Sequence, residues 1–211
     1  EPFDGLLIAT GARCRTLPGT EGLEGVHTLR TLDDCLAIRA ELDAGANRMV
    51  VIGAGFIGAN FVHRAVGRGD EVTVYDALTY AGNLANLEGL DGQPGYRFVH
   101  SDICDASALA EAMAGHDAVA HFAAESHVDR SLTDPARFVA TNCEGTSTVC
   151  RVALEAGIGR VLHVSTDEGY GSIHEGSFGE GDPLAPSSPY SASKAALDLI
   201  ALSYHETFGL P

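Results

Sequence analysis

The sequence predicts an α/β protein built on a doubly wound parallel sheet. Two observations lead to this fold class. From Arg48 onward, short runs of β-branched residues alternate with longer helical stretches, and the first run passes into its helix through the glycine-rich turn GAGFIG at residues 53–58. Parallel strands need crossover connections, which helices supply on both faces of the sheet. We therefore expect one sheet over residues 48–165, with the strand order 3-2-1-4-5.

The elements of this sheet can be assigned in chain order. Five strands are expected at RMVVIG (48–53), EVTVYD (71–76), YRFVHSD (96–102), HDAVAHFAA (116–124) and GRVLHVSTD (159–167). Helices are expected at FIGANFVHRAVGRG (56–69), ASALAEAMAG (106–115), DPARFVATNCEGTSTVCRVALEAG (134–157) and SPYSASKAALDLIALSYHETFG (188–209). The last helix has Ser187 or Ser188 as its N-cap and Pro189 in its first turn.

The first 47 residues follow a different pattern. FDGLLIATGA (3–12) reads as a strand that ends in a small-residue turn, and TLDDCLAIRAELDAG (31–45) reads as a capped amphipathic helix after a loop rich in Gly and Pro. We therefore divide the chain into an accessory fragment, residues 1–47, and one α/β domain, residues 48–211.

Composition limits the kinds of partner. Acidic residues outnumber basic ones 29 to 13, and the net charge of −16 disfavours binding to nucleic acid or to an anionic membrane. No apolar run is long enough to span a bilayer, and residues 1–13 lack the features of a signal peptide. The five cysteines and the histidines show no metal-ligand spacing. We expect a cytoplasmic protein with reduced thiols and no metal.

The glycine turn predicts a dinucleotide site in a Rossmann-type fold. Gly53 permits the tight turn, Gly55 lets a pyrophosphate approach the backbone, and Gly58 lets helix and strand pack closely. Asp76 ends the next strand, where its carboxylate can bind an adenosine ribose and repel a 2′-phosphate. This favours NAD over NADP. The alternative is a strand–turn–helix with no ligand.

Residues 53–211 resemble the dTDP-glucose 4,6-dehydratases, nucleotide-sugar enzymes of the extended short-chain dehydrogenase/reductase superfamily. The matching stretches are GAGFIGANFVHR, YDALTYAGNLANL, SDICD, HFAAESHVDRS, VSTDEGYGS and SPYSASKAALDL. Residues 1–58 are instead similar to ferredoxin-reductase-type FAD/NAD flavoproteins, on FDGLLIATGA and the stretch up to VVIGAGFIGA. The chain therefore resembles a chimera joined at the shared GAGFIG string. At the junction Ile52 stands where the dehydratases carry a further glycine, which puts cofactor affinity in question.

The YSASK and STDE stretches carry the expected catalytic residues. Tyr190 and Lys194 are four residues apart, hence on one helix face, where a neighbouring ammonium favours the phenolate of the tyrosine. By resemblance, Tyr190 removes the proton of the C4 hydroxyl, to which Thr166 hydrogen-bonds. Asp167 is the acid that protonates the departing C6 hydroxyl, and Glu168 is the base at C5. Gly169, where the family usually has Val, could loosen these carboxylates.

The resemblance extends the predicted site beyond the catalytic residues. The cofactor-binding set is Gly53, Gly55, Phe56, Ile57, Gly58, Asp76, Asp102, Ile103, Tyr190 and Lys194. The substrate-binding set is Glu125, Ser126, His127, Arg130 and Asn142, with Arg130 as the partner of a sugar or phosphate oxygen. A homodimer is expected.

The resemblance implies NAD-dependent dehydration of dTDP-glucose to the 4-keto-6-deoxy sugar. Two alternatives are an epimerase of the same superfamily, which the adjacent Asp-Glu pair disfavours, and a non-catalytic NAD-binding module. A flavin reductase is a weaker third possibility, because the first FAD-binding glycine motif is not present. Family members continue past HETFGLP into a smaller substrate domain, so we expect that domain to be missing here and turnover by this chain to be poor.

Overall fold

The computed structural model describes residues 48–173, 175–179 and 181–211. The strand and helix expected within residues 1–47 lie outside the described residues. The chain divides into two compact units, and the larger one comprises Ala46–Ser172 and Leu184–Pro211. This unit contains the whole sheet and every residue of the predicted site.

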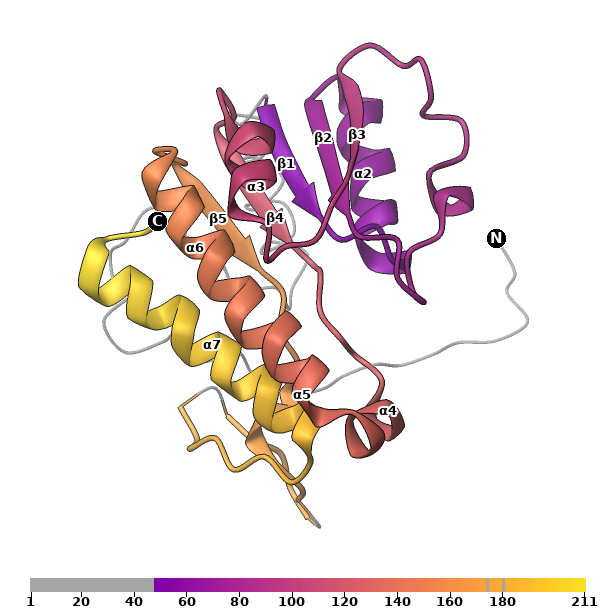
Figure 1. Ribbon diagram of the computed structural model, residues 1–211. Coiled ribbons are helices and arrows are strands. Elements are labelled where there is room, and N and C mark those ends of the chain that lie inside the picture. The colour runs from indigo at the N-terminus through magenta and orange to yellow at the C-terminus, as the bar shows by residue number, and fades with distance from the viewer. Residues whose placement is uncertain (1–47, 174, 180) are drawn as a thin grey trace, which may run out of the picture. The chain divides into compact units, whose positions relative to one another are not determined.

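The larger unit is built around a five-stranded parallel sheet (Figure 1). Its strands are β1 (Arg48–Ile52), β2 (Glu71–Asp76), β3 (Tyr96–His100), β4 (Ala118–His121) and β5 (Arg160–His163). Their order is β3-β2-β1-β4-β5, with parallel pairing throughout. The predicted fold class and strand order are confirmed.

Hydrophobic packing covers both faces of this sheet. Successive side chains of β1 point to opposite faces, so Val50 and Ile52 enter one cluster while Met49 and Val51 enter the other. The first cluster includes residues of the helices α3 (Ala106–Met113) and α6 (Thr146–Glu155), and the second those of α2 (Phe56–Arg68). In Figure 1, α2 accordingly lies on the side of the sheet away from α3 and α6.

The helix expected over residues 134–157 has a more complex structure. It consists of α5 (Pro135–Phe138), a π-helical segment (Val139–Gly145) and α6, and the short helix α4 (Val128–Thr133) precedes it. The wide π turn carries Asn142, whose side chain is fully buried. Such π segments occur often at functional sites.

The last helix, α7 (Pro189–Phe208), begins as predicted. Ser188 is its N-cap, Ser188 and Ser191 form a reciprocal capping box, and Pro189 occupies the first turn. The helix ends at Gly209, which has a left-handed conformation with φ of 70°. The capped N-terminus of α7 fixes the position of Tyr190 and Lys194, which lie in the first two turns of the helix.

Candidate active site

A cavity of about 1230 Å³ lies at the carboxyl edge of the sheet, where all five parallel strands end. This is where ligands bind in doubly wound folds. Most of the predicted site residues line it. They are Gly53, Gly55, Phe56, Ile57, Gly58, Asp76, Asp102, Ile103, Glu125, Ser126, Thr166, Tyr190 and Lys194.

The glycine turn has the shape that a dinucleotide phosphate requires. Gly53 has φ of +96°, and a Cβ there would lie 2.6 Å from the backbone nitrogen of Ala123. A Cβ at Gly58 would lie 1.9 Å from the carbonyl oxygen of Gly53, so only glycine permits this close packing. Nothing lies within 4 Å of a Cβ built at Gly55. The turn is therefore closed toward the protein and open at Gly55.

The start of α2 leaves backbone donors available. Its N-cap, Gly55, has no side chain to accept from the first N–H groups of the helix, and the first turn holds no acidic residue. Free N–H groups at a helix N-terminus bind anions such as phosphate. The side chains of Phe56 and Ile57 in this turn are exposed. These features fit the phosphates of a dinucleotide. They favour a dinucleotide site over the alternative of a strand–turn–helix with no ligand.

The Asp76 carboxylate, predicted to bind the adenosine ribose, also accepts two hydrogen bonds from the backbone. Its Oδ2 accepts from the backbone N–H of Ala54 at 2.5 Å, and its Oδ1 accepts from that of Leu78 at 2.6 Å. The carboxylate thus joins the glycine turn to the loop after β2. Each carboxylate oxygen has a further lone pair, so a ribose hydroxyl can still donate to it.

Asp102 and Ile103 follow β3 on the same edge. The carbonyl oxygen of Asp102 accepts from the hydroxyl of Tyr75 at 2.8 Å, and its Oδ1 accepts from the backbone N–H of Cys104 at 2.9 Å. Ile103 is buried and packs closely against Gly145 of the π-helical segment. Both residues line the cavity.

Tyr190 and Lys194 lie together in the cavity wall, and both are largely buried. The Lys194 ammonium donates to the carbonyl oxygen of Val164 at 3.1 Å. Burial lowers the pKa of Lys194, and the Asp198 carboxylate opposes that shift. Burial also raises the pKa of Tyr190, which the hydroxyl of Thr166 opposes. Burial thus acts against the phenolate, which the Lys194 ammonium and the positive charge of a nicotinamide would favour.

The STDE turn occupies the end of β5 but is only partly inside the cavity. Thr166 lines it and caps the 3₁₀ turn Asp167–Tyr170, its Oγ1 accepting from the N–H of Glu168 at 3.3 Å. Asp167 and Glu168 are exposed and are not among the described residues that line the cavity. Both carboxylates nevertheless contribute to the raised pKa of Tyr190. The predicted acid and base therefore lie within electrostatic reach of the predicted proton acceptor.

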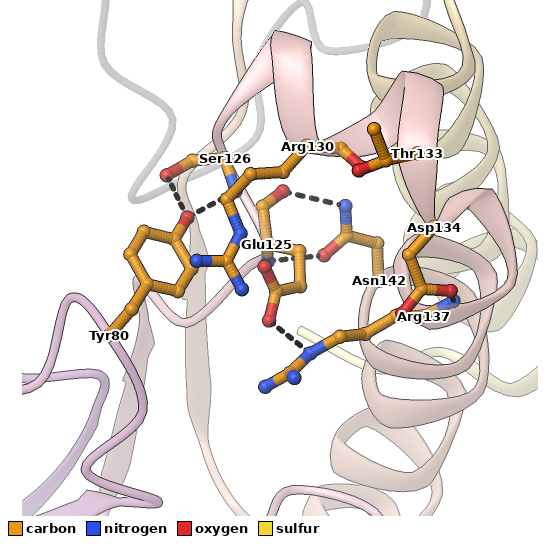
Figure 2. Close-up of polar contacts among 8 residues, drawn as sticks. All are labelled: Tyr80, Glu125, Ser126, Arg130, Thr133, Asp134, Arg137 and Asn142. Atoms are coloured by element: carbon orange, nitrogen blue, oxygen red, sulfur yellow. Dashed lines mark hydrogen bonds and ion pairs between the residues drawn. The ribbon is translucent and has the colours of Figure 1, made fainter.

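Asn142 and Arg130 are placed differently from the expectation that they contact substrate (Figure 2). Asn142 is fully buried, and its amide clamps the backbone of Glu125: Oδ1 accepts from Glu125 N at 2.8 Å, and Nδ2 donates to Glu125 O at 3.0 Å. Nδ2 also donates to Ser193 Oγ at 2.8 Å, which ties α7 to this loop. The Arg130 guanidinium lies over the Tyr80 ring, 4.0 Å from its centroid. Because neither side chain lines the cavity, we assign both to positioning.

The other residues of the HFAAESHVDRS stretch divide between wall and surface. Ser126 lines the cavity, and its N–H donates to the Tyr80 hydroxyl at 3.3 Å. His127 is exposed at the start of α4 and is not part of the described cavity wall. Glu125 is buried, with its Oε1 accepting from Arg137 Nε at 2.7 Å.

Several cavity residues were not predicted from the sequence. Tyr80, Asn86, Arg137 and Thr141 all line the cavity. The signal for Thr141 and Arg137 is their spacing of four residues, which places them on one helix face. Tyr80 and Asn86 lie in the irregular loop after β2, where no periodicity could indicate their direction.

The described residues contain neither a candidate metal site nor a membrane span. No group of three or more His, Cys, Asp or Glu side chains there could hold a metal ion. No helix in that part of the chain has the length and apolarity needed to cross a membrane.

Comparisons with known proteins agree with this geometry. A dTDP-glucose 4,6-dehydratase from an Actinoplanes strain is 53% identical over 170 residues, which are 77% of this chain and 53% of the relative. The low-salt glycan biosynthesis protein Agl12 of Haloferax volcanii is 51% identical over 164 residues, 77% of this chain and 53% of that protein. The chain thus spans about half the length of the curated relatives it matches.

Solved structures show the same relationship. The dTDP-glucose 4,6-dehydratase DesIV of Streptomyces venezuelae, with NAD and TYD bound, is 54% identical with a TM-score of 0.75, over 77% of this chain and 53% of that one. UDP-glucose 4-epimerase of Brucella ovis, in complex with NAD, is 30% identical with a TM-score of 0.70, over 78% of this chain and 50% of that one.

Two family models match, and they overlap at the glycine turn. Residues 2–86 match the pyridine nucleotide-disulphide oxidoreductase model, in keeping with the resemblance of the N-terminal residues to flavoproteins. The GDP-mannose 4,6 dehydratase model matches residues 49–211, well over half of the chain. The chain belongs to this GDP-mannose 4,6 dehydratase family and is homologous to the dTDP-glucose 4,6-dehydratases within it.

Proposed function

We propose that this chain is the cofactor-binding part of an NAD-dependent dehydratase that converts dTDP-glucose to dTDP-4-keto-6-deoxyglucose. One observation carries the proposal: a single cavity holds the glycine turn, Asp76 and the Thr166–Tyr190–Lys194 set. NAD bound there supplies a hydride acceptor for C4 of the sugar. The names of the relatives indicate the substrate, since several are dTDP-glucose 4,6-dehydratases.

The chain's own residues perform the proton transfers. Tyr190 takes the proton of the C4 hydroxyl, and Thr166, which caps the neighbouring turn, accepts or donates a hydrogen bond at the same oxygen. Lys194, whose ammonium donates to Val164 O after β5, would hold the nicotinamide ribose. A keto group at C4 makes the adjacent C5 proton acidic, which prepares the elimination.

Elimination of water needs both an acid and a base. Glu168 removes the C5 proton while Asp167 gives its proton to the C6 hydroxyl, which leaves as water. The resulting C5–C6 double bond is then reduced: the hydride taken from C4 would return to C6, and Glu168 gives its proton back to C5, so that no net oxidant is consumed. Their adjacent position on the turn after β5 supports this division and favours a dehydratase over an epimerase, which expels no water.

The proposal is tested in two steps. The 211-residue chain, which spans about half the length of its curated relatives, should bind NAD in calorimetry. In a longer protein with a substrate domain, Asp167→Asn and Glu168→Gln should abolish water loss while C4 oxidation persists. Failure of the chain to bind NAD contradicts the proposal. Loss of C4 oxidation in both variants contradicts only the division of labour.

We further propose that the protein is a cytoplasmic homodimer. α7 exposes Leu199, Leu202 and Phe208, and the neighbouring helical segments expose Leu132 and Val139. Exposed apolar side chains on adjacent helices support an interface, since such surfaces are typical of protein contacts when they are contiguous. Light scattering that gives the mass of a monomer at micromolar concentration would contradict the dimer.

The division into an accessory fragment, residues 1–47, and an NAD-binding domain, residues 48–211, is also a proposal. Within the described residues β1 has a partner on each side, β2 and β4, so the centre of the sheet is complete from Arg48. Removal of the first 47 residues should therefore preserve a cooperative thermal transition and NAD binding. Loss of that transition contradicts the division.

The match of residues 2–86 to flavin-type oxidoreductases favours one alternative, a flavin reductase. A visible absorption spectrum of the purified protein distinguishes it, since a flavin peak supports the reductase and a colourless sample excludes bound flavin. A non-catalytic NAD-binding module is distinguished by the absence of turnover in the longer protein.

A further inference from the structure

Arg137 is one of two basic side chains among the described residues that line the cavity, and the proposed mechanism does not use it. Four carboxylates line the cavity, those of Asp76, Asp102, Glu125 and Asp134. Among the described lining residues only Arg137 and Lys194 are basic, and the Lys194 ammonium is buried against the carbonyl oxygen of Val164. A ligand with two phosphates meets a predominantly acidic wall here. Arg137 is therefore the basic side chain that remains to offset the negative charge of such a ligand.

Arg137 is held in place by a buried acid (Figure 2). Its Nε donates to Glu125 Oε1 at 2.7 Å, and Glu125 is 3% exposed whereas the Arg137 side chain is 44% exposed. The backbone of Glu125 is in turn fixed by the Asn142 amide. The carboxylate thus lies on the protein side of the pair and the guanidinium on the solvent side.

The pair leaves hydrogen-bonding groups unused on both partners. Arg137 makes an end-on contact through Nε, so in the part of the chain that the structure describes its two terminal nitrogens have no hydrogen-bond partner. Glu125 Oε2 is buried and has no donor. Arginine–carboxylate pairs frequently use two nitrogens and two oxygens, which this pair does not. Because Arg137 lines the cavity, its terminal nitrogens are available to a ligand there.

The location connects Arg137 to the glycine turn. Ala123 N donates to Ile52 O at 2.9 Å, and the Ala123 backbone touches the position of a Cβ on Gly53. Glu125 comes two residues later, a backbone span of at most about 7 Å. Arg137 therefore lies on the cavity wall that starts at the phosphate-binding turn.

We propose that Arg137 binds the diphosphate group of a nucleotide in this cavity, oriented for that contact by Glu125. Guanidinium matches phosphate oxygens in charge and geometry, and the glycine turn supplies only neutral N–H groups. This inference rests on the proposed function for the presence of a dinucleotide, and the diphosphate can belong to the cofactor or to the sugar nucleotide.

The test compares Arg137→Met with Arg151→Met. Arg151 has a similar exposure of 45% and an ion pair with Glu155 on α6, so both variants lose one charge at a paired, half-exposed arginine. Calorimetry measures the Kd of each protein for NAD, for dTDP and for adenosine, which has no phosphate. We expect Arg137→Met to weaken NAD or dTDP binding about tenfold, the value of one charge-assisted hydrogen bond. Adenosine binding and the Arg151 variant should not change.

The nucleotide that responds identifies the source of the diphosphate. Weaker binding of NAD assigns Arg137 to the cofactor, and weaker binding of dTDP alone assigns it to the substrate. Unchanged affinity for both in a folded Arg137→Met protein overturns the inference while NAD binding, and with it the proposed function, stands. If the wild-type chain binds neither nucleotide, both fail.

Loss of Arg137 leaves Glu125 as an unpaired buried charge, which can prevent folding. The pair Glu125→Gln and Glu125→Gln/Arg137→Met removes this difficulty, because the amide needs no counter-ion. The double variant should bind the responding nucleotide about tenfold more weakly than the single one. Equal affinities overturn the inference.

Discussion

The two ends of the cavity are held by different means. The start of the glycine turn, at the end of β1, is buried and fixed by protein atoms: Gly53 N donates to Tyr75 O at 2.8 Å, and Ala54 N donates to Asp76. The turn after β5 carries exposed carboxylates and follows a strand whose residues are only partly buried. Two contacts to α7 hold it, those of Lys194 with Val164 and of Asp198 with Ser165.

This difference separates the residues proposed to bind the cofactor from those proposed to transfer protons. The glycine turn and Asp76, proposed to bind the cofactor, follow β1 and β2, which are almost completely buried. Of the residues proposed to move protons, those of the STDE turn follow the outer strand β5, and Tyr190 lies on α7. Changes at the first end should therefore affect both stability and cofactor affinity, whereas changes at the second should have local effects.

The largest effect is expected for Gly58→Ala. A Cβ at residue 58 would lie 1.9 Å from Gly53 O, a backbone atom that cannot give way without distortion of the turn. We expect a loss of about 3 kcal/mol or more in the free energy of unfolding and about 100-fold in NAD affinity. Denaturant unfolding and calorimetry measure the two quantities.

Gly67→Ala is the matched control in the same helix. Nothing lies within 4 Å of a Cβ at residue 67, so this change should stabilise α2 by roughly 0.5–1 kcal/mol. Equal stability losses in the two variants would show that the glycine turn is not the rigid end of the cavity.

The second prediction concerns Asp76 and cofactor choice. Asp76→Ala removes the acceptor for Ala54 N and Leu78 N as well as the proposed partner of the adenosine ribose. We expect NAD affinity to fall about 30-fold, in the range of a hydrogen bond to a charged group, and the preference over NADP to disappear. Calorimetric titration with both cofactors checks this, and unchanged affinity with unchanged preference would refute the ribose assignment.

The sequence predicted the two ends of the cavity with different success. The glycine turn, Asp76 and the Ser188 cap depend on residues close together in the chain, so spacing alone determines them. The direction of Asn142 depends on the π-helical segment, which rotates the residues after Phe138 relative to a regular helix. No periodicity reveals that change. Arg130, on α4, stacks on Tyr80 in the loop after β2, a contact between segments far apart in sequence that no local pattern indicates.

The third prediction addresses the weaker end. Asp198 Oδ2 accepts from Ser165 Oγ at 2.6 Å, and its Oδ1 lies 3.5 Å from His163 Nε2. Asp198→Ala should therefore loosen the turn after β5 at a cost of about 1–2 kcal/mol in unfolding free energy. Hydrogen exchange should become faster at residues 165–170 and stay unchanged at residues 53–58. Asp198→Asn, which retains an acceptor, should have a smaller effect, and faster exchange at both ends would contradict the separation.

The smallest effect is expected from a histidine that lies between the two ends. His121 closes β4, pairs with Ile52 of β1 and His163 of β5, and is completely buried. Burial, with His163 and Lys194 nearby, holds the pKa of His121 well below its usual value. The folded protein therefore keeps this imidazole neutral, while the unfolded chain takes up a proton below about pH 6.5. Since the unfolded state binds more protons there, stability is fully present above that pH and decreases as the pH falls. We expect about 1 kcal/mol to be lost between pH 6.5 and 5.5 from this residue, and His121→Gln to flatten the measured profile of unfolding free energy by that amount.

His116→Gln is the comparison, because burial also lowers the pKa of His116 but leaves it partly accessible. The prediction is contradicted if His116→Gln flattens the pH profile of the unfolding free energy more than His121→Gln does. That result would mean that the buried His121 imidazole takes up a proton in the folded protein.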